Sequence, residues 1–160
     1  FRQIAHDLLV VDDRAVGIDR LRSAAAFPQD SPLDTETAGQ FFSSQSFTAA
    51  AEDTDTGEIV GLYILHPNNV GRCGHICNAS YAVKKNMRGR HIGEALVRDS
   101  LSKGRECGFR ILQFNAVTAS NKGAQALYEK IGFTRVGTVP EGFRRNDGTY
   151  DDIIIYIIKL

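Results

Sequence analysis

The sequence predicts a protein of mixed helices and strands, α/β in the broad sense and α+β in the narrower one. Its helices cover the faces of a mixed β-sheet. Three observations predict this class. Residues 46–51 and 58–65 are strand-like and are joined by turn-forming residues, as in a hairpin. Residues 92–107 and 121–131 carry apolar side chains at helical spacing. Strand-like segments precede and follow both helices, and the order β-α-β-α-β-β after the hairpin is typical of a sheet with helices on its faces.

Length and composition indicate one ordinary globular domain over residues 1–160. Hydrophobic residues make up 42% and charged residues 24%, which excludes a disordered, collagen-like or disulfide-dominated chain. Nineteen Lys and Arg balance nineteen Asp and Glu, so the overall charge attracts neither nucleic acid nor an anionic membrane. Apolar runs are far shorter than the roughly 20 residues of a membrane helix, and no signal-peptide pattern is present. We expect a cytoplasmic protein with no nucleic-acid or membrane partner.

Three cysteines, Cys73, Cys77 and Cys107, are too few for a disulfide framework and are typical of reduced cytosolic thiols. Cys73, His75 and Cys77 alternate, and alternation on a strand would put all three on one face. A zinc site would need a fourth ligand and a supporting loop. We therefore expect no metal.

The first half of the chain is weakly patterned. Residues 15–26 have helical spacing that ends before Pro28, and residues 30–34 are expected to form a loop. Residues 35–44 are expected to form a second helix with a Thr or Asp N-cap. A turn over residues 53–57 then closes the hairpin.

The second half is patterned more clearly, with Gly108 and Gly132 ending two helices. Pro140 is expected to end its strand, and the β-branched last strand is expected to lie in the centre of the sheet. The predicted strands are residues 75–83, 109–117, 133–139 and 150–158, the loop is 84–90, and the last turn is 146–148.

The segment around residues 83–96 is typical of a strand end, a glycine-containing loop and a helix start. The first amides of a helix lack internal partners and carry the positive end of the helix dipole, so they stabilise anions. Arg88 and Arg90 add charge that suits a pyrophosphate. Neither a P-loop nor a dinucleotide-binding glycine motif is present. Gly89 and Gly93 are also explained by the shape of a turn, so the loop alone leaves both interpretations open.

Two polar residues mark the next helix. Asn121 precedes it, where an N-cap is the simpler interpretation. Tyr128 lies on its apolar stripe, where a core position is the simpler interpretation. Neither residue alone indicates a function.

Two runs carry a family resemblance. They are R-G-R-H-I-G-E-A-L-V at residues 88–97 and F-N-A-V-T-A-S-N-K-G-A-Q-A-L-Y-E-K-I-G-F at residues 114–133. Together they resemble the GCN5-related N-acetyltransferases, and the resemblance extends over about residues 57–160. The family's closing pattern, N-x-x-A-x-x-x-Y-x-x-x-G-F, is matched in full. Its loop, Q/R-x-x-G-x-G/A, is matched with one departure, because His91 replaces the first glycine and its Cβ restricts the loop conformation.

The resemblance implies the acyl-CoA N-acyltransferase (GNAT) fold, with a mostly antiparallel central sheet, and acetyl-CoA as the donor. It implies that the pantetheine arm lies along the backbone of Ala82 and Val83, that Asn121 contacts the cofactor, and that Tyr128 acts as general acid toward the departing sulfur. The family also suggests a homodimer. The implied pyrophosphate contacts are the amides of Arg88, Gly89, Arg90, His91, Ile92 and Gly93.

Transfer of an acetyl group to an amine needs no nucleophilic side chain when both substrates are held together. Cys107 falls at a predicted helix end and no G-x-S-x-G motif is present, so direct attack is expected. The amine must first lose a proton. His75, Glu94 and Asp152 are candidate bases, and each also has a simpler structural explanation.

Asn78 and Asn115 lie inside apolar strands that should be neighbours, where asparagine is uncommon. A buried amide needs partners, so each either joins an internal network or meets a ligand. The blocks H-I-C-N-A-S-Y and Q-F-N-A-V resemble the family branch that includes a fungal acetyltransferase of proline analogues such as azetidine-2-carboxylate. This resemblance implies that both asparagines orient a small amino acid.

The leading hypothesis is a small-molecule N-acetyltransferase with an amine acceptor. A protein or peptide N-acetyltransferase and a cofactor-binding module without catalysis are the alternatives. Acceptor contacts are expected from the N-terminal helices and the last hairpin, for example Phe143, Arg144 and Tyr150.

Overall fold

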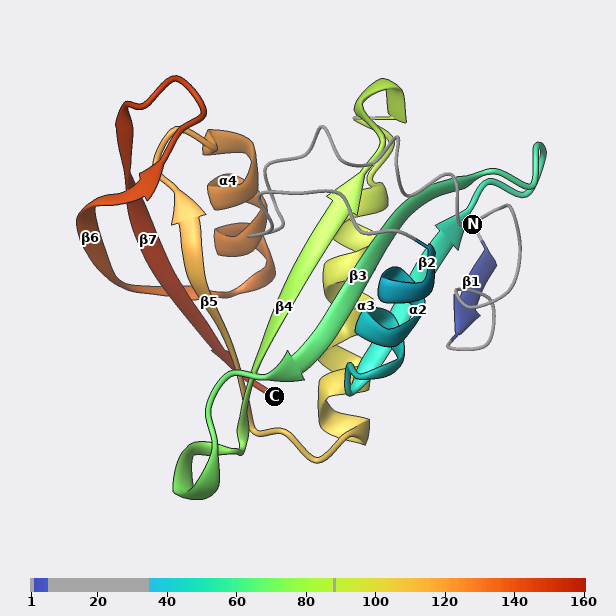
Figure 1. The fold of residues 1–160 in the computed structure, drawn as a ribbon, viewed down its shortest axis with the longest axis horizontal. Helices are drawn as coiled ribbons and strands as arrows, with labels where there is room; N and C mark the ends of the chain where they lie inside the picture. Colours follow the sequence, from blue (N-terminus) through green and yellow to red (C-terminus); the bar gives the residue numbers. More distant parts are fainter. Residues whose placement is uncertain (1, 6–34, 88) are drawn as a thin grey trace. The chain divides into compact units, whose positions relative to one another are not determined.

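The computed structural model describes residues 2–5, 35–87 and 89–160 (Figure 1). The predicted helix at 15–26 and loop at 30–34 lie outside these residues. The chain divides into two compact units, one with the described residues up to His66 and Ala79–Lys103, the other with Pro67–Asn78 and Gly104–Leu160. The boundary between the two units falls within one β-strand, between Asn78 and Ala79. A single domain over residues 1–160 therefore stays a prediction. None of the helices in the described ranges is long and apolar enough to cross a membrane.

The first unit is built on strands in the order β1-β2-β3-β4. Both β1 with β2 and β2 with β3 pair antiparallel. The elements are β1 (Arg2–Ala5), α2 (Thr35–Ser43), β2 (Phe47–Glu52), β3 (Ile59–Pro67), the end of β4 (Ile76–Val83) and most of α3 (Ile92–Glu106). The helix at 35–44, the strands of the hairpin and the helix at 92–107 are thus confirmed to within two residues. Strand β1 was not predicted, because four residues are too few to show a period of two.

The hairpin prediction is confirmed by the turn that joins β2 to β3. The Asp53 amide donates to the Glu58 carbonyl at 2.8 Å, and the Gly57 amide donates to the Asp53 carbonyl at 2.8 Å. The register then shifts between Ala51 and Glu52, which is the signature of a β-bulge. We call residues 53–58 the hairpin turn.

Strand β3 is buried on both faces because α2 and α3 lie on opposite sides of it (Figure 1). Leu62 and Ile64 belong to a core cluster with Phe42 of α2. Gly61 faces α3 instead, where a Cβ added to it would lie 3.0 Å from Leu96 Cδ1 and 3.1 Å from Ile92 Cγ2. Successive side chains of a strand point to opposite faces, so this alternation explains how one strand supports two helices.

The second unit contains strands in the order β4-β5-β7-β6. The start of β4 pairs parallel with β5, through Ile76 with Ile111 and Cys77 with Leu112. Pairs β5–β7 and β6–β7 are antiparallel, so the predicted mixed sheet and the interior place of the last strand are confirmed. The elements are β5 (Ile111–Thr118), α4 (Lys122–Ile131), β6 (Thr134–Arg144), β7 (Tyr150–Lys159) and a short 3-10 helix, η3 (Gly71–Cys73).

Helix α4 begins and ends where the sequence predicts. The side chain of Asn121 accepts a hydrogen bond from the Ala124 amide at 3.2 Å and acts as the N-cap. Gly132 has a φ of 109° and donates its amide to the Tyr128 and Glu129 carbonyls. Glycine enters this left-handed region without a Cβ clash.

The prediction that Pro140 ends its strand is wrong, because β6 continues to Arg144. The register of β6 against β7 shifts between Val139 and Phe143. Glu141 takes a φ of 54° there and donates its amide to Asp152 Oδ1 at 2.9 Å. Strand β6 pairs with β7 alone and is the last in the strand order, and an edge strand tolerates a proline at a bulge since no ladder hydrogen bond is lost.

Replacement of Gly61 by alanine is expected to lower the free energy of unfolding by about 1–3 kcal/mol, because the new Cβ would push Ile92 and Leu96 away from the sheet. Urea denaturation of purified protein measures this. The control is Gly39→Ala in α2, where nothing lies within 4 Å of an added Cβ and where alanine should stabilise the helix by about 0.5–1 kcal/mol. Equal stability of the two variants would contradict the close packing of α3.

Candidate functional site

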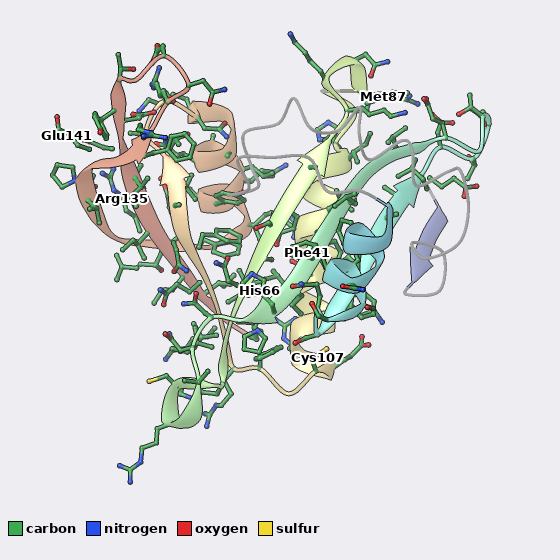
Figure 2. The ribbon with its side chains drawn as sticks, viewed as in Figure 1. Phe41, His66, Met87, Cys107, Arg135 and Glu141 are labelled. Atoms are coloured by element: carbon green, nitrogen blue, oxygen red, sulfur yellow. The ribbon has the colours of Figure 1, made fainter. Side chains whose placement is uncertain are left out.

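The connection between β4 and α3 carries the predicted anion-binding amides. After β4 the chain forms a short 3-10 helix, η4 (Lys85–Met87), and Figure 2 labels Met87 on this connection. The Ala95 amide donates to the His91 carbonyl at 3.1 Å, and the amides of Ile92 and Gly93 precede that first bond. Such amides carry the positive end of the helix dipole. Arg88 lies outside the described residues.

Two of the described residues in this connection adopt left-handed backbone conformations. Gly89 has a φ of 79° and His91 has a φ of 59°. His91 therefore keeps the conformation that suits the family's glycine although it carries a Cβ, at a cost of roughly 1–2 kcal/mol. Its side chain is 82% exposed, and Nδ1 lies 3.6 Å from Glu94 Oε2.

The Arg90 side chain contacts protein groups. Its Nη1 donates to Asp53 Oδ2 at 3.2 Å and lies 3.1 Å from Met87 Sδ. Asp53 is nearly buried, and its Oδ1 accepts from the Asp55 amide at 3.1 Å. That backbone hydrogen bond, together with the Arg90 charge, holds the pKa of Asp53 below its ordinary value against the opposing effect of burial. Arg90 therefore faces a carboxylate that is ionised at neutral pH.

The end of β4 supplies backbone rather than side chains. The Ala82 side chain is buried in the cluster with Leu62 and Phe42. The Lys84 amide donates to the Val60 carbonyl at 2.9 Å, which holds the end of β4 beside β3. Val83 is half-buried. The contact of Ala82 and Val83 with a cofactor stays a prediction.

Tyr128 on α4 lies in an aromatic cluster of the second unit. Its ring centroid is 4.4 Å from that of Phe114, 5.5 Å from that of Phe133 and 6.0 Å from that of Tyr156. Burial raises the pKa of Tyr128 to about 12, so the phenol stays protonated at neutral pH. The ring of Tyr128 therefore occupies the core position that the sequence indicates.

The Tyr128 hydroxyl differs from that of its neighbour Tyr156. The Tyr156 hydroxyl donates to Glu129 Oε1 at 2.8 Å, whereas no hydrogen-bond partner of the Tyr128 hydroxyl is found among the described residues. No buried side-chain nitrogen or oxygen in the described ranges lacks a partner. The Tyr128 oxygen must therefore reach the accessible surface, where it can donate to a ligand.

Asn115 joins a cluster of side-chain amides with Asn68 and Gln113, which we call the amide cluster. Asn115 Nδ2 donates to Asn68 Oδ1 at 2.5 Å, and Gln113 Nε2 donates to Asn115 Oδ1 at 2.8 Å. Asn115 is exposed, so the expectation of a buried amide is wrong for it. The reason is its position where the β5–β7 register shifts, between Phe114 and Val117.

The amide cluster contains a residue that the sequence analysis missed. Asn68 directly follows β3 and has no strand or helix pattern around it, and only the Asn-Asn pair after Pro67 marks it. Asn78 is half-buried on β4. The strands of Asn78 and Asn115 pair with each other, as predicted, but among the described residues no hydrogen bond joins the two side chains.

Asn121 is exposed, and its Oδ1 is the N-cap acceptor for Ala124. Its contact with a cofactor stays a prediction. Two of the three candidate bases have protein partners: Glu94 accepts from Arg98 at 2.9 Å, and Asp152 accepts from the Glu141 amide. His75 is exposed.

Cys73, His75 and Cys77 do not share one strand, so their alternation in the sequence does not place them on one face. Cys73 lies in η3 and is exposed, whereas Cys77 lies in β4 and is buried, because the chain between them turns before β4 begins. Cys77 Sγ donates to the Ile111 carbonyl at 3.3 Å, and burial raises its pKa to about 12. Among the described residues no group of three or more His, Cys, Asp or Glu side chains could hold a metal. Cys107 is exposed just after α3.

The predicted acceptor residues Phe143, Arg144 and Tyr150 lie where β6 and β7 meet. Phe143 is opposite Asp151 and Arg144 is opposite Tyr150. Tyr150 is 58% exposed. Asp151 links this hairpin to the start of α4, because it accepts from Ser120 Oγ at 2.5 Å and from Arg145 Nη2 at 2.8 Å.

Comparison with known proteins gives concordant results. The model of the acetyltransferase (GNAT) family matches residues 16–133. The chain is 34% identical to the N-acetyltransferase aca1 of Schizosaccharomyces pombe over 119 residues, which are 70% of this chain and 57% of aca1. The chain thus spans little more than half the length of that relative.

Solved structures have the same fold. A GCN5-related N-acetyltransferase from Kribbella flavida matches with a TM-score of 0.82 and 28% identity, over 99% of this chain and 97% of that one. The yncA protein of Salmonella typhimurium, solved with its cofactor acetyl-CoA, matches with a TM-score of 0.82 over 99% and 94% of the chains. At 16% identity the second match supports the fold alone.

Replacement of His91 by glycine is expected to raise the free energy of unfolding by about 1 kcal/mol, because glycine has no Cβ to clash at a φ of 59°. His91→Val is expected to lower it, since a β-branched side chain tolerates this region least. Urea denaturation measures both, with His91→Ala as the control that keeps a Cβ. A glycine variant less stable than the wild type would show that the left-handed conformation is not maintained in solution.

Proposed function

Because the chain belongs to the acetyltransferase (GNAT) family, we propose that it transfers an acetyl group from acetyl-CoA to the amine of a small molecule. The acceptor class that the residues favour is a small amino acid or a proline analogue. The transfer is direct: both substrates are bound at once and no acyl-enzyme forms. The observation that carries the proposal is the Tyr128 hydroxyl, which is protonated, accessible and without a partner among the described residues.

Donor binding is supported by the connection between β4 and α3. The amides of Ile92 and Gly93 suit a pyrophosphate, because they precede the first bond of α3. The left-handed conformations of Gly89 and His91 turn the chain into the helix. Backbone at Ala82 and Val83 would pair with the amide groups of the pantetheine arm, and Asn121 would add a side-chain contact at the start of α4.

The transfer requires three things of the protein. The attacking amine must be neutral and close to the thioester carbonyl. The oxygen of that carbonyl gains negative charge as the new C–N bond forms, and a backbone N–H near Val83 would stabilise it. When the C–S bond breaks, the sulfur takes the electron pair, and Tyr128 supplies the proton. The attacking nitrogen loses one proton to water, and water returns a proton to the Tyr128 phenolate, so that the products are an amide and a free thiol and the phenol is restored.

Acceptor recognition is supported by the amide cluster of Asn68, Gln113 and Asn115. Side-chain amides both donate and accept hydrogen bonds, which suits the carboxylate and the nitrogen of an amino acid. The sequence around Asn78 and Asn115 resembles the branch that acetylates proline analogues, and aca1 is named as an N-acetyltransferase. Of the two predicted residues, Asn115 belongs to this cluster, and Asn68 and Gln113 join it there.

The proposal is tested by thiol release from acetyl-CoA across a panel of amino acids, cyclic imino acids, amines and peptides. Turnover with small amino or imino acids is the expected result. Turnover on peptides alone would favour a peptide N-acetyltransferase instead. Thermal stabilisation by acetyl-CoA without turnover on any acceptor would favour a binding module.

The same assay tests the acceptor residues. Asn115→Ala is expected to raise KM for the acceptor or to lower kcat, while calorimetry finds acetyl-CoA binding unchanged. Asn69→Ala is a matched control, since Asn69 is an exposed neighbour outside the amide cluster. Kinetics of Asn115→Ala equal to those of the wild type would remove the amide cluster from acceptor binding.

Replacement of Tyr128 by phenylalanine is expected to lower kcat roughly 100-fold, because the departing sulfur loses its proton donor. The affinity for acetyl-CoA, measured by calorimetry, should stay the same. In the wild type, kcat should show no loss through pH 10, the ordinary phenol pKa, since that of Tyr128 is raised to about 12. Above that value the phenol is ionised and cannot donate.

The control for this variant is Tyr156→Phe, which removes a hydroxyl that is occupied by Glu129. It should lower stability and leave kcat nearly unchanged. If both variants lost activity equally, the aromatic cluster as a whole would matter, and Tyr128 would not be the acid.

A further inference from the structure

Two ion pairs join the hairpin turn to the connection between β4 and α3. Arg90 Nη1 lies 3.2 Å from Asp53 Oδ2, and Lys84 Nζ forms an ion pair with Glu58 Oε1. Asp53 and Glu58 are the first and last residues of the hairpin turn. Lys84 and Arg90 stand on either side of η4. The two pairs therefore hold both ends of the connection that carries the anion-binding amides.

In each pair one partner is nearly buried and the other is more exposed. The Asp53 side chain is 8% exposed against 50% for Arg90, and the Lys84 side chain is 9% exposed against 46% for Glu58. A buried charge that loses its partner is costly. The arrangement therefore resists separation of the turn from the connection more strongly than two surface pairs would.

Asp53 uses its two carboxylate oxygens for different purposes. Oδ1 accepts from the Asp55 amide and shapes the turn, and Oδ2 accepts from Arg90. A rigid turn thus presents a fixed acceptor to a side chain of the loop. The Arg90 guanidinium, which the sequence predicts as a phosphate ligand, is directed to this acceptor and to Met87.

We propose that Arg90 and Asp53 are a positioning pair: the pair sets the conformation of the loop whose amides bind the pyrophosphate, and Arg90 does not itself bind phosphate. The inference rests on the proposed function. It assigns to the hairpin turn a part in donor binding through Asp53. Glu58 and Lys84 support the other end of the same loop.

The two roles for Arg90 make opposite predictions for Asp53→Asn. Asparagine keeps the oxygen that accepts from Asp55 but removes the charge that holds Arg90. If Arg90 bound phosphate directly, this variant would bind coenzyme A more tightly, because a negative charge is lost and a guanidinium is released. If the pair positions the loop, the variant binds coenzyme A more weakly.

The experiment is a double-mutant cycle of Asp53→Asn and Arg90→Gln, with the dissociation constant of coenzyme A measured by calorimetry. We expect each single variant to weaken binding by roughly threefold to tenfold. The double variant should be no weaker than either single one, since both remove the same contact. Additive losses, or tighter binding by Asp53→Asn, would overturn the inference.

Pantetheine, which lacks the pyrophosphate, separates positioning from general loss of structure. Its affinity should be the same in the wild type and in all three variants, because the loop contacts only the part of coenzyme A that pantetheine lacks. An equal loss for pantetheine and coenzyme A would mean that the variants disturb the fold, and the inference would fail. Asp55→Asn, an exposed carboxylate in the same turn, is the charge-matched control and should bind coenzyme A as the wild type does.

Failure of the inference is distinct from failure of the proposed function. A wild-type protein without measurable affinity for coenzyme A would contradict both. A wild type that binds coenzyme A, together with an Asp53→Asn variant that binds it equally well, would overturn the positioning pair and leave the proposed function intact.

Discussion

The close packing of α3 on β3 is the contact on which the candidate donor site depends. Gly61 leaves the space into which Ile92 and Leu96 fit. Ile92 is also the first residue of α3, so the same contact fixes the start of the helix against the sheet. The amides of Ile92 and Gly93 are therefore held by packing, so the anion binding proposed for them would need no rearrangement of the helix. Hydrophobic burial thus positions an electrostatic site.

Charge in this region is organised by pairing. The hairpin turn places two carboxylates beside two cations of the loop, and the overall charge of the chain is zero. Arginine in an anion-binding loop is usually interpreted as a ligand, but a nearly buried carboxylate within hydrogen-bond distance competes for it. In the proposed donor site, the helix dipole and the amides of Ile92 and Gly93, rather than the Arg90 side chain, would then attract the anion.

In the second unit, Tyr128 and Tyr156 pack against each other but differ in the hydrogen bonding of their hydroxyl groups. Tyr156 is fully buried, and its hydroxyl is satisfied by Glu129. Tyr128 packs its ring against the same cluster but leaves its hydroxyl accessible. Core position and catalytic role are often treated as alternatives for such a residue. Here the ring occupies a core position, and the burial that accompanies it keeps the phenol protonated at neutral pH, as the proposed role requires.

The sequence by itself determined the elements whose signals are local. The hairpin, α3, α4, the Asn121 N-cap and the Gly132 C-cap follow from residues within a few positions of one another, and the family pattern around Tyr128 is equally local. Only the tertiary structure decided β1, the continuation of β6 past Pro140, the partner of Arg90 and the inclusion of Asn68 in the amide cluster. Each of these depends on residues far apart in the chain, such as Arg90 with Asp53 or Asn115 with Asn68. Side-chain hydrogen bonds between distant residues, and the position of a strand at the edge of a sheet, are established only when the chain folds. The periodicity of apolar residues along the sequence does not predict them.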